Sequence, residues 1–247
     1  MKIWLLSSLF LIQTNNLIGA VQAQTTIINE TSTEVIEQQT LLPFSAKYTA
    51  FRSGRDIGDA GLELTQLADN QYQLTYYSDV SRFFLSDKRH EQTLFSQQNN
   101  NFIPQQYHYK RTGTGPNKKL NVQFDYDSNK ILINNETSMD YNGELDNQLF
   151  RIDLPRKLAK GVTKTSYDFI NYRGDKRHYE LEVVYSESIV LPFGNIEAIK
   201  VKINRESKSR VTYAWFAPSL GYNLVRLQQF KDEKEQGDMQ LSSFSYL

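Results

Sequence analysis

The 247-residue sequence contains no cysteine. This absence excludes disulfide bonds, thiolate zinc sites, iron–sulfur clusters and cysteine nucleophiles. The chain also lacks an excess of either charge, because 28 Lys and Arg residues balance 28 Asp and Glu residues. Nucleic-acid binding and a polybasic membrane patch both need a strong or clustered positive excess. We therefore predict no nucleic-acid partner.

Long apolar runs are missing as well, apart from one near the N-terminus. The run Ile3–Ile12 follows Met1-Lys2 and is too short to span a bilayer, which needs about 20 apolar residues. Val21-Gln22-Ala23 then precedes a candidate cleavage point at Gln24. We expect residues 1–23 to be a signal peptide and the mature chain to be soluble and periplasmic or secreted, with no transmembrane segment. The alternative is an uncleaved amphipathic anchor.

Residues 24–40 are polar and contain no aromatic side chain. We expect them to form a flexible tether, with a short accessory strand as the alternative. No later stretch is long, polar and rich in glycine or serine, so residues 41–247 are predicted to form a single β-rich domain.

Proline and glycine are sparse, at 6 and 12 residues, whereas tyrosine and phenylalanine number 15 and 14. Aromatic residues fit a pleated, half-buried surface. Apolar and polar residues alternate in segments such as Leu120–Tyr126 and Tyr179–Val183, which is the period of a strand with one wet face. Turn-forming clusters separate about a dozen such strands. The predicted fold class is all-β, a curved antiparallel sheet closing to a barrel or clam.

One mid-chain segment departs from the strand period. Its apolar residues share one side of a helix over residues 145–160: Leu145, Leu149, Ile152 and Leu158. Asp146 is a candidate cap, and Gly161 is a candidate C-terminal stop. Because Pro155 kinks a helix, we expect one broken helix or two short ones that cover the curled sheet.

Residues suited to catalysis are few. The only histidines are His90, His108 and His178, and no two of them have the spacing of a metal site. There is no Gly-x-Ser-x-Gly motif, and no pair of carboxylates stands out. Gly113–Lys119 lacks the ending of a phosphate loop and reads as a basic hairpin tip. We predict no catalytic residue, no metal site and no cofactor.

The aromatic side chains are the feature of the sequence that most directly suggests a function. In a closed barrel they would fill the interior as core, whereas in a partly open sheet they would line an apolar groove. Such a groove suits a lipid, a glycan or an extended peptide, and tyrosine adds a polar tip. The candidate ligand-binding residues are Tyr72, Tyr76, Tyr109, Phe124, Tyr213 and Trp215.

From Pro43 to Leu247 the chain resembles a family of bacterial exported proteins known as domain of unknown function 3108. The resemblance rests on these segments: Leu42–Tyr48, Ile57-Gly58, Leu62–Leu64, the helix ending at Gly161, Leu191–Gly194, Ile196–Val201 and Ala214–Pro218. Tyr222–Val225 departs from the Pro-Val usual in the family. The resemblance implies an exported protein with a curved, partly open β-barrel, and it supplies no activity or catalytic residue.

Three functional hypotheses follow from these observations. The first is an exported envelope protein that binds, without catalysis, an apolar or amphipathic ligand or a partner protein in the curved sheet; the candidate partners are a lipid, a glycan or an envelope protein. The second is a hydrolase acting on envelope glycan or ester. The third is a structural module that presents hairpin edges. All three assume that the aromatic rings gather on the inner wall of one bent sheet.

Overall fold

The computed structural model describes residues 41–205 and 209–247 of the chain. The predicted signal peptide (1–23) and tether (24–40) lie outside the described residues. Fifteen strands form one sheet. They are β1 (Phe44–Arg52), β2 (Arg55–Ala68), β3 (Gln71–Arg82), β4 (Leu85–Gln98), β5 (Asn101–Gly113), β6 (Lys118–Asp125), β7 (Lys130–Ile133), β8 (Thr137–Asp140), β9 (Leu145–Asp146), β10 (Lys164–Ile170), β11 (Lys176–Leu191), β12 (Gly194–Arg205), β13 (Arg210–Ala217), β14 (Asn223–Lys231) and β15 (Lys234–Tyr246).

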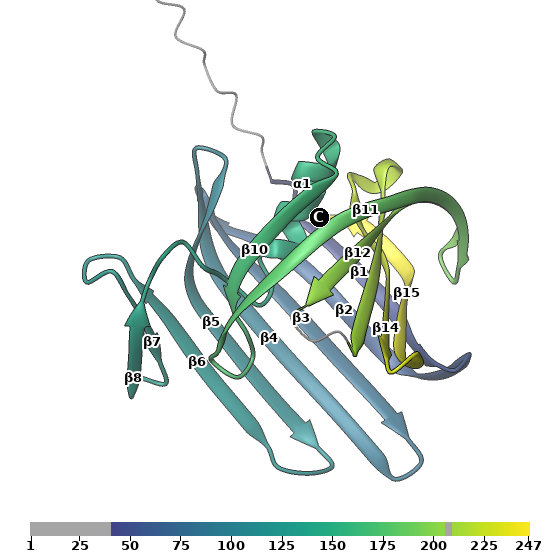
Figure 1. Cartoon of the computed structure of the whole chain (residues 1–247), viewed down its shortest axis with the longest axis horizontal. Helices are drawn as coiled ribbons and strands as arrows, with labels where there is room; N and C mark the ends of the chain where they lie inside the picture. Colours follow the sequence, from purple (N-terminus) through teal and green to yellow (C-terminus); the bar gives the residue numbers. More distant parts are fainter. Residues whose placement is uncertain (1–40, 206–208) are drawn as a thin grey trace, which may run out of the picture. The chain divides into compact units, whose positions relative to one another are not determined.

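Strands that follow one another in sequence lie side by side in the sheet. The order runs from β8 back to β1, continues with β15 and ends at β9. Pairing is antiparallel throughout, except that β9 pairs parallel with β10. The strands β8 and β9 are the two ends of this order, so the sheet is curved but not closed (Figure 1). This confirms the predicted fold class, with more strands than the expected dozen.

Side-chain alternation explains why these segments are strands. In β6, Leu120, Val122 and Phe124 are buried while their neighbours face water. Several of the connecting turns place asparagine in the left-handed region, including Asn70 at φ 58° and Asn100 at φ 65°. Asparagine tolerates this region better than most residues, which favours tight hairpins.

The one α-helix within residues 41–205 and 209–247, α1 (Phe150–Ala159), lies inside the curve of the sheet (Figure 1). The expectation of a broken helix or two short ones is wrong, because α1 continues through Pro155. Proline removes one backbone hydrogen bond, and burial of Leu154 and Leu158 offsets that loss. The helix also starts at Phe150 instead of Leu145, since Leu145–Asp146 pairs as β9. A short 3₁₀ turn, η1 (Pro218–Leu220), follows β13.

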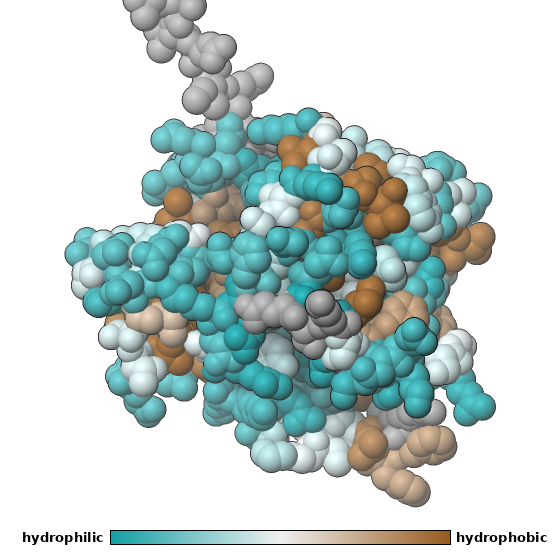
Figure 2. Space-filling view, viewed as in Figure 1, coloured by the Kyte–Doolittle hydropathy of each residue, from teal (hydrophilic) through white to brown (hydrophobic). Residues whose placement is uncertain are grey.

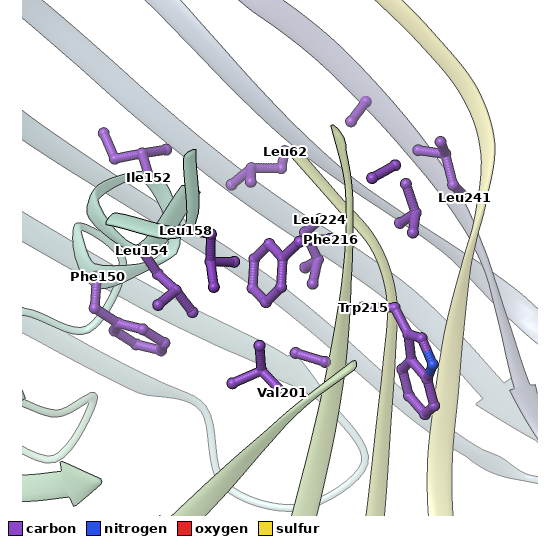
Figure 3. Packing of buried hydrophobic residues seen from close by; sticks show 14 of the residues in the cluster. Leu62, Phe150, Ile152, Leu154, Leu158, Val201, Trp215, Phe216, Leu224 and Leu241 are labelled. Atoms are coloured by element: carbon purple, nitrogen blue, oxygen red, sulfur yellow. The ribbon is translucent and has the colours of Figure 1, made fainter. Parts of the chain in front are cut away.

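The main core lies between α1 and the sheet. Figure 3 shows Leu154 and Leu158 from the helix beside Val201 and Phe216 from the strands. A second, smaller core lies where β5, β6 and β7 meet the end of β10, and its buried members include Tyr109, Phe124 and Ile170. No helix in the described ranges is long and apolar enough to cross a membrane.

Candidate binding cavity

A cavity of about 360 Å³ lies beside α1 on the concave side of the sheet. We call it the inner cavity. Strands β1 to β4 line one part of it, β11 to β15 line another, and Phe150 and Arg151 of α1 lie between them. Its wall includes apolar side chains such as Phe51, Ile57 and Leu227. Both halves of the sheet therefore contribute to one concave site.

A second cavity, of about 390 Å³, adjoins the first, and we call it the rim cavity. The two share five lining residues: Asn147, Tyr172, Tyr179, Arg205 and Arg210. The lining of the rim cavity includes these basic residues: Arg173, Arg177, His178, Arg205 and Arg210. Two of them contact carboxylates at its edge, because Arg177 pairs with Asp175 at 2.7 Å and His178 contacts Asp168 at 2.8 Å. Arg173, Arg205 and Arg210, which have no carboxylate partner among the described residues, supply positive charge where the rim meets the inner cavity.

The carboxylates of the inner cavity already have partners. Asp238 accepts two hydrogen bonds from Arg226, at 2.8 and 2.6 Å. Asp87 accepts two from Arg89, at 2.9 and 3.1 Å, and one from Arg111 at 3.1 Å. Burial raises the pKa of Asp87, but these two guanidinium groups outweigh it and lower that pKa below its ordinary value. These two acids are therefore poor counter-ions for the remaining arginines.

Three arginines of the inner cavity have no carboxylate partner among the described residues: Arg151, Arg205 and Arg210. The Arg151 guanidinium lies 4.8 Å from the centre of the Tyr76 ring, and that of Arg205 lies 5.0 Å from the Tyr179 ring. Nε of Arg205 is buried with no hydrogen-bond partner among the residues described. A concave wall with unpaired cations concentrates positive potential, and guanidinium binds carboxylate and phosphate in a bidentate manner.

A third acid of the cavity, Glu91, is held by a buried polar network. Its Oε2 accepts hydrogen bonds from the Tyr107 hydroxyl at 2.6 Å, from Asn147 Nδ2 at 2.8 Å and from Gln148 Nε2. Burial, followed by the Glu91 charge, raises the pKa of Tyr107 well above its ordinary value. Tyr107 therefore stays protonated and keeps donating, so the network fixes the floor of the cavity.

Asp146 is fully buried and does not line either cavity. Its Oδ1 accepts from Thr93 Oγ1 at 2.9 Å and from the backbone N–H of Gln148 at 2.7 Å and of Leu149 at 3.2 Å. Burial raises its pKa to about 7, although these hydrogen bonds lower it. Asp146 thus ties the turn before α1 to β4. The expectation that it caps the helix is wrong, because Leu149 is the N-cap of α1 and no side chain of the described residues caps it.

The six predicted ligand-binding residues do not gather in one place. Tyr76 lines the inner cavity and carries the Arg151 guanidinium. Tyr72 packs in the main core and stacks on Phe95, with ring centres 5.6 Å apart. Tyr109 and Phe124 belong to the second core. Three of these four rings are therefore core in the structure, which is the alternative that the sequence left open.

Tyr213 and Trp215 face away from α1. Thr212, Ala214 and Phe216 line a small cavity together with the helix, so alternation puts the two aromatic rings on the opposite face of β13. Figure 3 shows Phe216 on the helix side and Trp215 away from it. The expectation that both rings turn inward is wrong. The Lys200 ammonium lies over both rings, 4.7 Å from the centre of Tyr213 and 5.0 Å from that of Trp215, and the Arg226 guanidinium lies 4.8 Å from the Trp215 centre. Trp215 Nε1 donates to Glu187 at 2.8 Å.

The histidines are dispersed. His90 and His108 are exposed on β4 and β5. His178 contacts Asp168 at 2.8 Å and lines the rim cavity. No group of three or more metal-ligating side chains forms among the residues described.

Sequence reasoning missed the arginines of the cavity. Arg151 sits on α1, Arg205 ends β12 and Arg210 begins β13, so no spacing in the sequence links the first to the other two. The sequence did contain one signal for the cavity. Arg151 is a charged residue between Phe150 and Ile152, two residues that are buried in the helix. It marks the side of α1 that meets a polar space.

The chain belongs to the DUF3108 family of proteins of unknown function, whose model matches residues 43–233. No curated protein matches the chain. A β-barrel-like protein of the DUF1849 domain of unknown function from Brucella abortus shares the fold, with a TM-score of 0.59, 9% identity, and coverage of 84% of this chain and 98% of that one. These findings confirm the family indicated by the sequence.

Two further solved structures are more distant. One is a Bacteroides fragilis protein with a YmcC-like fold, described as exported, with a TM-score of 0.34, 11% identity, and coverage of 83% of this chain and 97% of that one. The other is a protein from Parabacteroides distasonis described as a lipoprotein, with a TM-score of 0.32, 12% identity, and coverage of 85% of this chain and 98% of that one.

Proposed function

We propose that this protein is exported and that it binds an anionic, amphipathic ligand, without catalysis, in the inner cavity. The observation that carries the proposal is the pair Arg151 and Arg205, which line a cavity of mixed polar and apolar wall and have no carboxylate partner among the described residues. A carboxylate or phosphate head group supplies the missing counter-ion.

The rest of the lining suits the tail of such a ligand. Phe51, Ile57 and Leu227 offer apolar surface beside the arginines, and burying a tail against them is favourable by roughly 25 cal/mol per Å². A volume of about 360 Å³ falls within the common range of small-molecule pockets, roughly 300–1,000 Å³. The adjoining rim cavity extends the space available to a longer molecule.

The alternative, a hydrolase acting on envelope glycan or ester, has less support. Oε2 of Glu91 already accepts three hydrogen bonds, and Asp146 is shut off from both cavities. His90 and His108 do not line the inner cavity. A catalytic acid or base must reach the reacting atoms, and these groups are occupied or remote from the ligand space.

The ligand is tested by purifying the full chain from its native envelope fraction and identifying extracted lipids by mass spectrometry. We expect an anionic lipid near one equivalent in the wild type and its loss in the double variant Arg151→Met, Arg205→Met. The matched control is Arg55→Met, because Arg55 is exposed and lines neither cavity. Absence of any bound amphiphile, or equal retention by the double variant, would contradict the proposal.

Export is tested separately by N-terminal sequencing of the protein recovered outside the cytoplasm. Cleavage by a signal peptidase at the Val21-Gln22-Ala23 site gives a mature chain that starts near Gln24. A chain that still begins at Met1 would show that residues 1–23 are retained.

A further inference from the structure

The turn between β3 and β4 exposes three consecutive apolar side chains. The exposed fraction is 81% for Phe83, 98% for Phe84 and 62% for Leu85. Among the described residues no other three consecutive large apolar side chains are exposed; Val190, at 82%, stands singly, and Tyr246 and Leu247 form a pair at 49% and 67%. These three adjacent residues, Phe83, Phe84 and Leu85, form a continuous apolar surface at the end of a long hairpin, which we call the apolar tip.

The apolar tip is not a product of turn chemistry. Phe83 has a φ of 55°, in the left-handed region. Corresponding turns of the sheet place Asn70 or Asn100 there, and a bulky side chain is unfavourable in this region. Phe83 therefore occupies an unfavourable backbone region while most of its side chain is exposed to water. Such a strained position is expected where another function requires the side chain.

A basic hairpin is fastened beside the apolar tip. At the β5–β6 turn, the Thr114 hydroxyl donates to the Phe84 carbonyl at 3.3 Å, and the Thr114 backbone N–H donates to the Ser86 carbonyl at 2.8 Å. Figure 1 shows the two hairpins side by side at one end of the sheet, and Figure 2 shows apolar surface at that end.

This second hairpin carries unpaired positive charge. Lys110, Lys118 and Lys119 are exposed and have no ion pair among the described residues. Lys110 lies directly opposite Lys119 in the β5–β6 pair. Like charges in opposed positions destabilise a sheet, so the arrangement calls for an anionic partner.

We propose that the apolar tip docks the protein onto an anionic lipid bilayer. Phe83, Phe84 and Leu85 enter the boundary between head groups and acyl chains, and the three lysines face lipid phosphates. Apolar insertion and attraction of lysines to anionic lipids add together. A stable protein interface buries about 800 Å² on each partner, which three side chains on a narrow tip do not supply. Val80 and Asp87 of the same hairpin line the inner cavity, so docking brings the cavity close to the bilayer.

The first test is flotation of the full chain with vesicles of phosphatidylglycerol and phosphatidylcholine. We expect binding to the anionic vesicles and a loss of about tenfold for Phe83→Asn and again for Phe84→Ser, from the apolar area each removes. Lys118→Glu with Lys119→Glu should abolish the preference for anionic vesicles. Phe83→Asn also suits the turn, so its Tm should not fall, which separates docking from folding. Val190→Ser is the matched control and should bind like the wild type.

A local reporter removes any contribution of the apolar run at the N-terminus. Phe84→Trp in a Trp4→Phe background leaves Trp215, on β13, as the internal reference. We expect brominated lipids to quench the residue 84 indole and not that of Trp215. An unquenched residue 84, unchanged binding by Phe83→Asn with Phe84→Ser, or capture of a protein partner without any affinity for bilayers would each overturn the proposal.

Discussion

The two sides of α1 meet the same curved sheet and yet differ in character. Below Leu154 and Leu158 the space is filled by strand side chains such as Phe216, and these form the dry core. One turn earlier, Arg151 faces the inner cavity, whose wall mixes apolar groups with guanidinium groups that have no carboxylate partner in the described part of the chain. The helix therefore separates the concavity into a part that holds the fold together and a part left for a ligand.

This contrast teaches where function resides in a sheet of this size. A curved sheet of fifteen strands encloses more surface than one short helix covers. The covered part follows the packing rules of any interior. The uncovered part keeps charged groups that a core would exclude, and these define what it binds.

The largest expected effect on stability comes from substitutions on the side of α1 that packs in the main core. Leu154→Ala removes a side chain that is 2% exposed and leaves a cavity in the main core. We expect a loss of about 3 kcal/mol in the free energy of unfolding, measured by urea denaturation. Val190→Ala, at an exposed position, should change the same quantity by less than about 0.5 kcal/mol. Equal effects at the two positions would refute the assignment of the core.

A smaller effect is expected at the boundary between the two sides, where Asp146 anchors the turn before α1. Its pKa is about 7 in the fold, against an ordinary value of 3.8, which the unfolded chain retains. Between these values the folded state binds more protons, so this group's contribution to stability falls as pH rises and is fully lost above pH 7. From pH 5 to pH 8 we expect a decrease of about 2.5 kcal/mol.

The control for this effect is Asp146→Asn, which keeps an oxygen acceptor for the Gln148 and Leu149 N–H groups. The variant should not show the decrease, and urea denaturation of both proteins across this pH range measures the difference. Parallel pH profiles for the two proteins would contradict the account of Asp146.

The smallest effect on stability is expected from substitutions on the side of α1 that faces the inner cavity. Arg151→Met keeps the helix propensity of the position and loses the contact with the Tyr76 ring, which is worth about 0.5–1 kcal/mol. We expect the free energy of unfolding to change by no more than about 1 kcal/mol, while the amount of anionic ligand retained by the protein falls. A loss of stability similar to that of Leu154→Ala would place Arg151 in the core instead.

Local patterns predicted the strands well, because alternation in segments such as Leu120–Phe124 is set by neighbours in sequence. The pattern did not reveal which face is concave. Tyr213 and Trp215 alternate as clearly as the residues of β6, yet they lie on the face away from α1. The direction in which a strand faces depends on how the sheet bends, and that is decided by partners elsewhere in the chain.

The cavity was beyond sequence reasoning for the same reason. Arg151 and Arg205 come from α1 and β12, and they meet only because the sheet curves around the helix. The start of α1 was misplaced because the parallel pairing of β9 with β10 joins segments separated by the helix. Composition alone, with balanced charges, hid the uneven distribution of those charges in space.

The central claim is that Arg151 and Arg205, which have no carboxylate partner among the described residues, make the inner cavity selective for anionic amphiphiles. The direct measurement is titration calorimetry with two ligands that share one acyl chain, lysophosphatidic acid and monoacylglycerol, below their aggregation concentrations. We predict that the phosphate ligand binds at least about tenfold more tightly and that the Arg151→Met, Arg205→Met variant removes the difference. Equal affinity of the two ligands for the wild-type protein would contradict the claim.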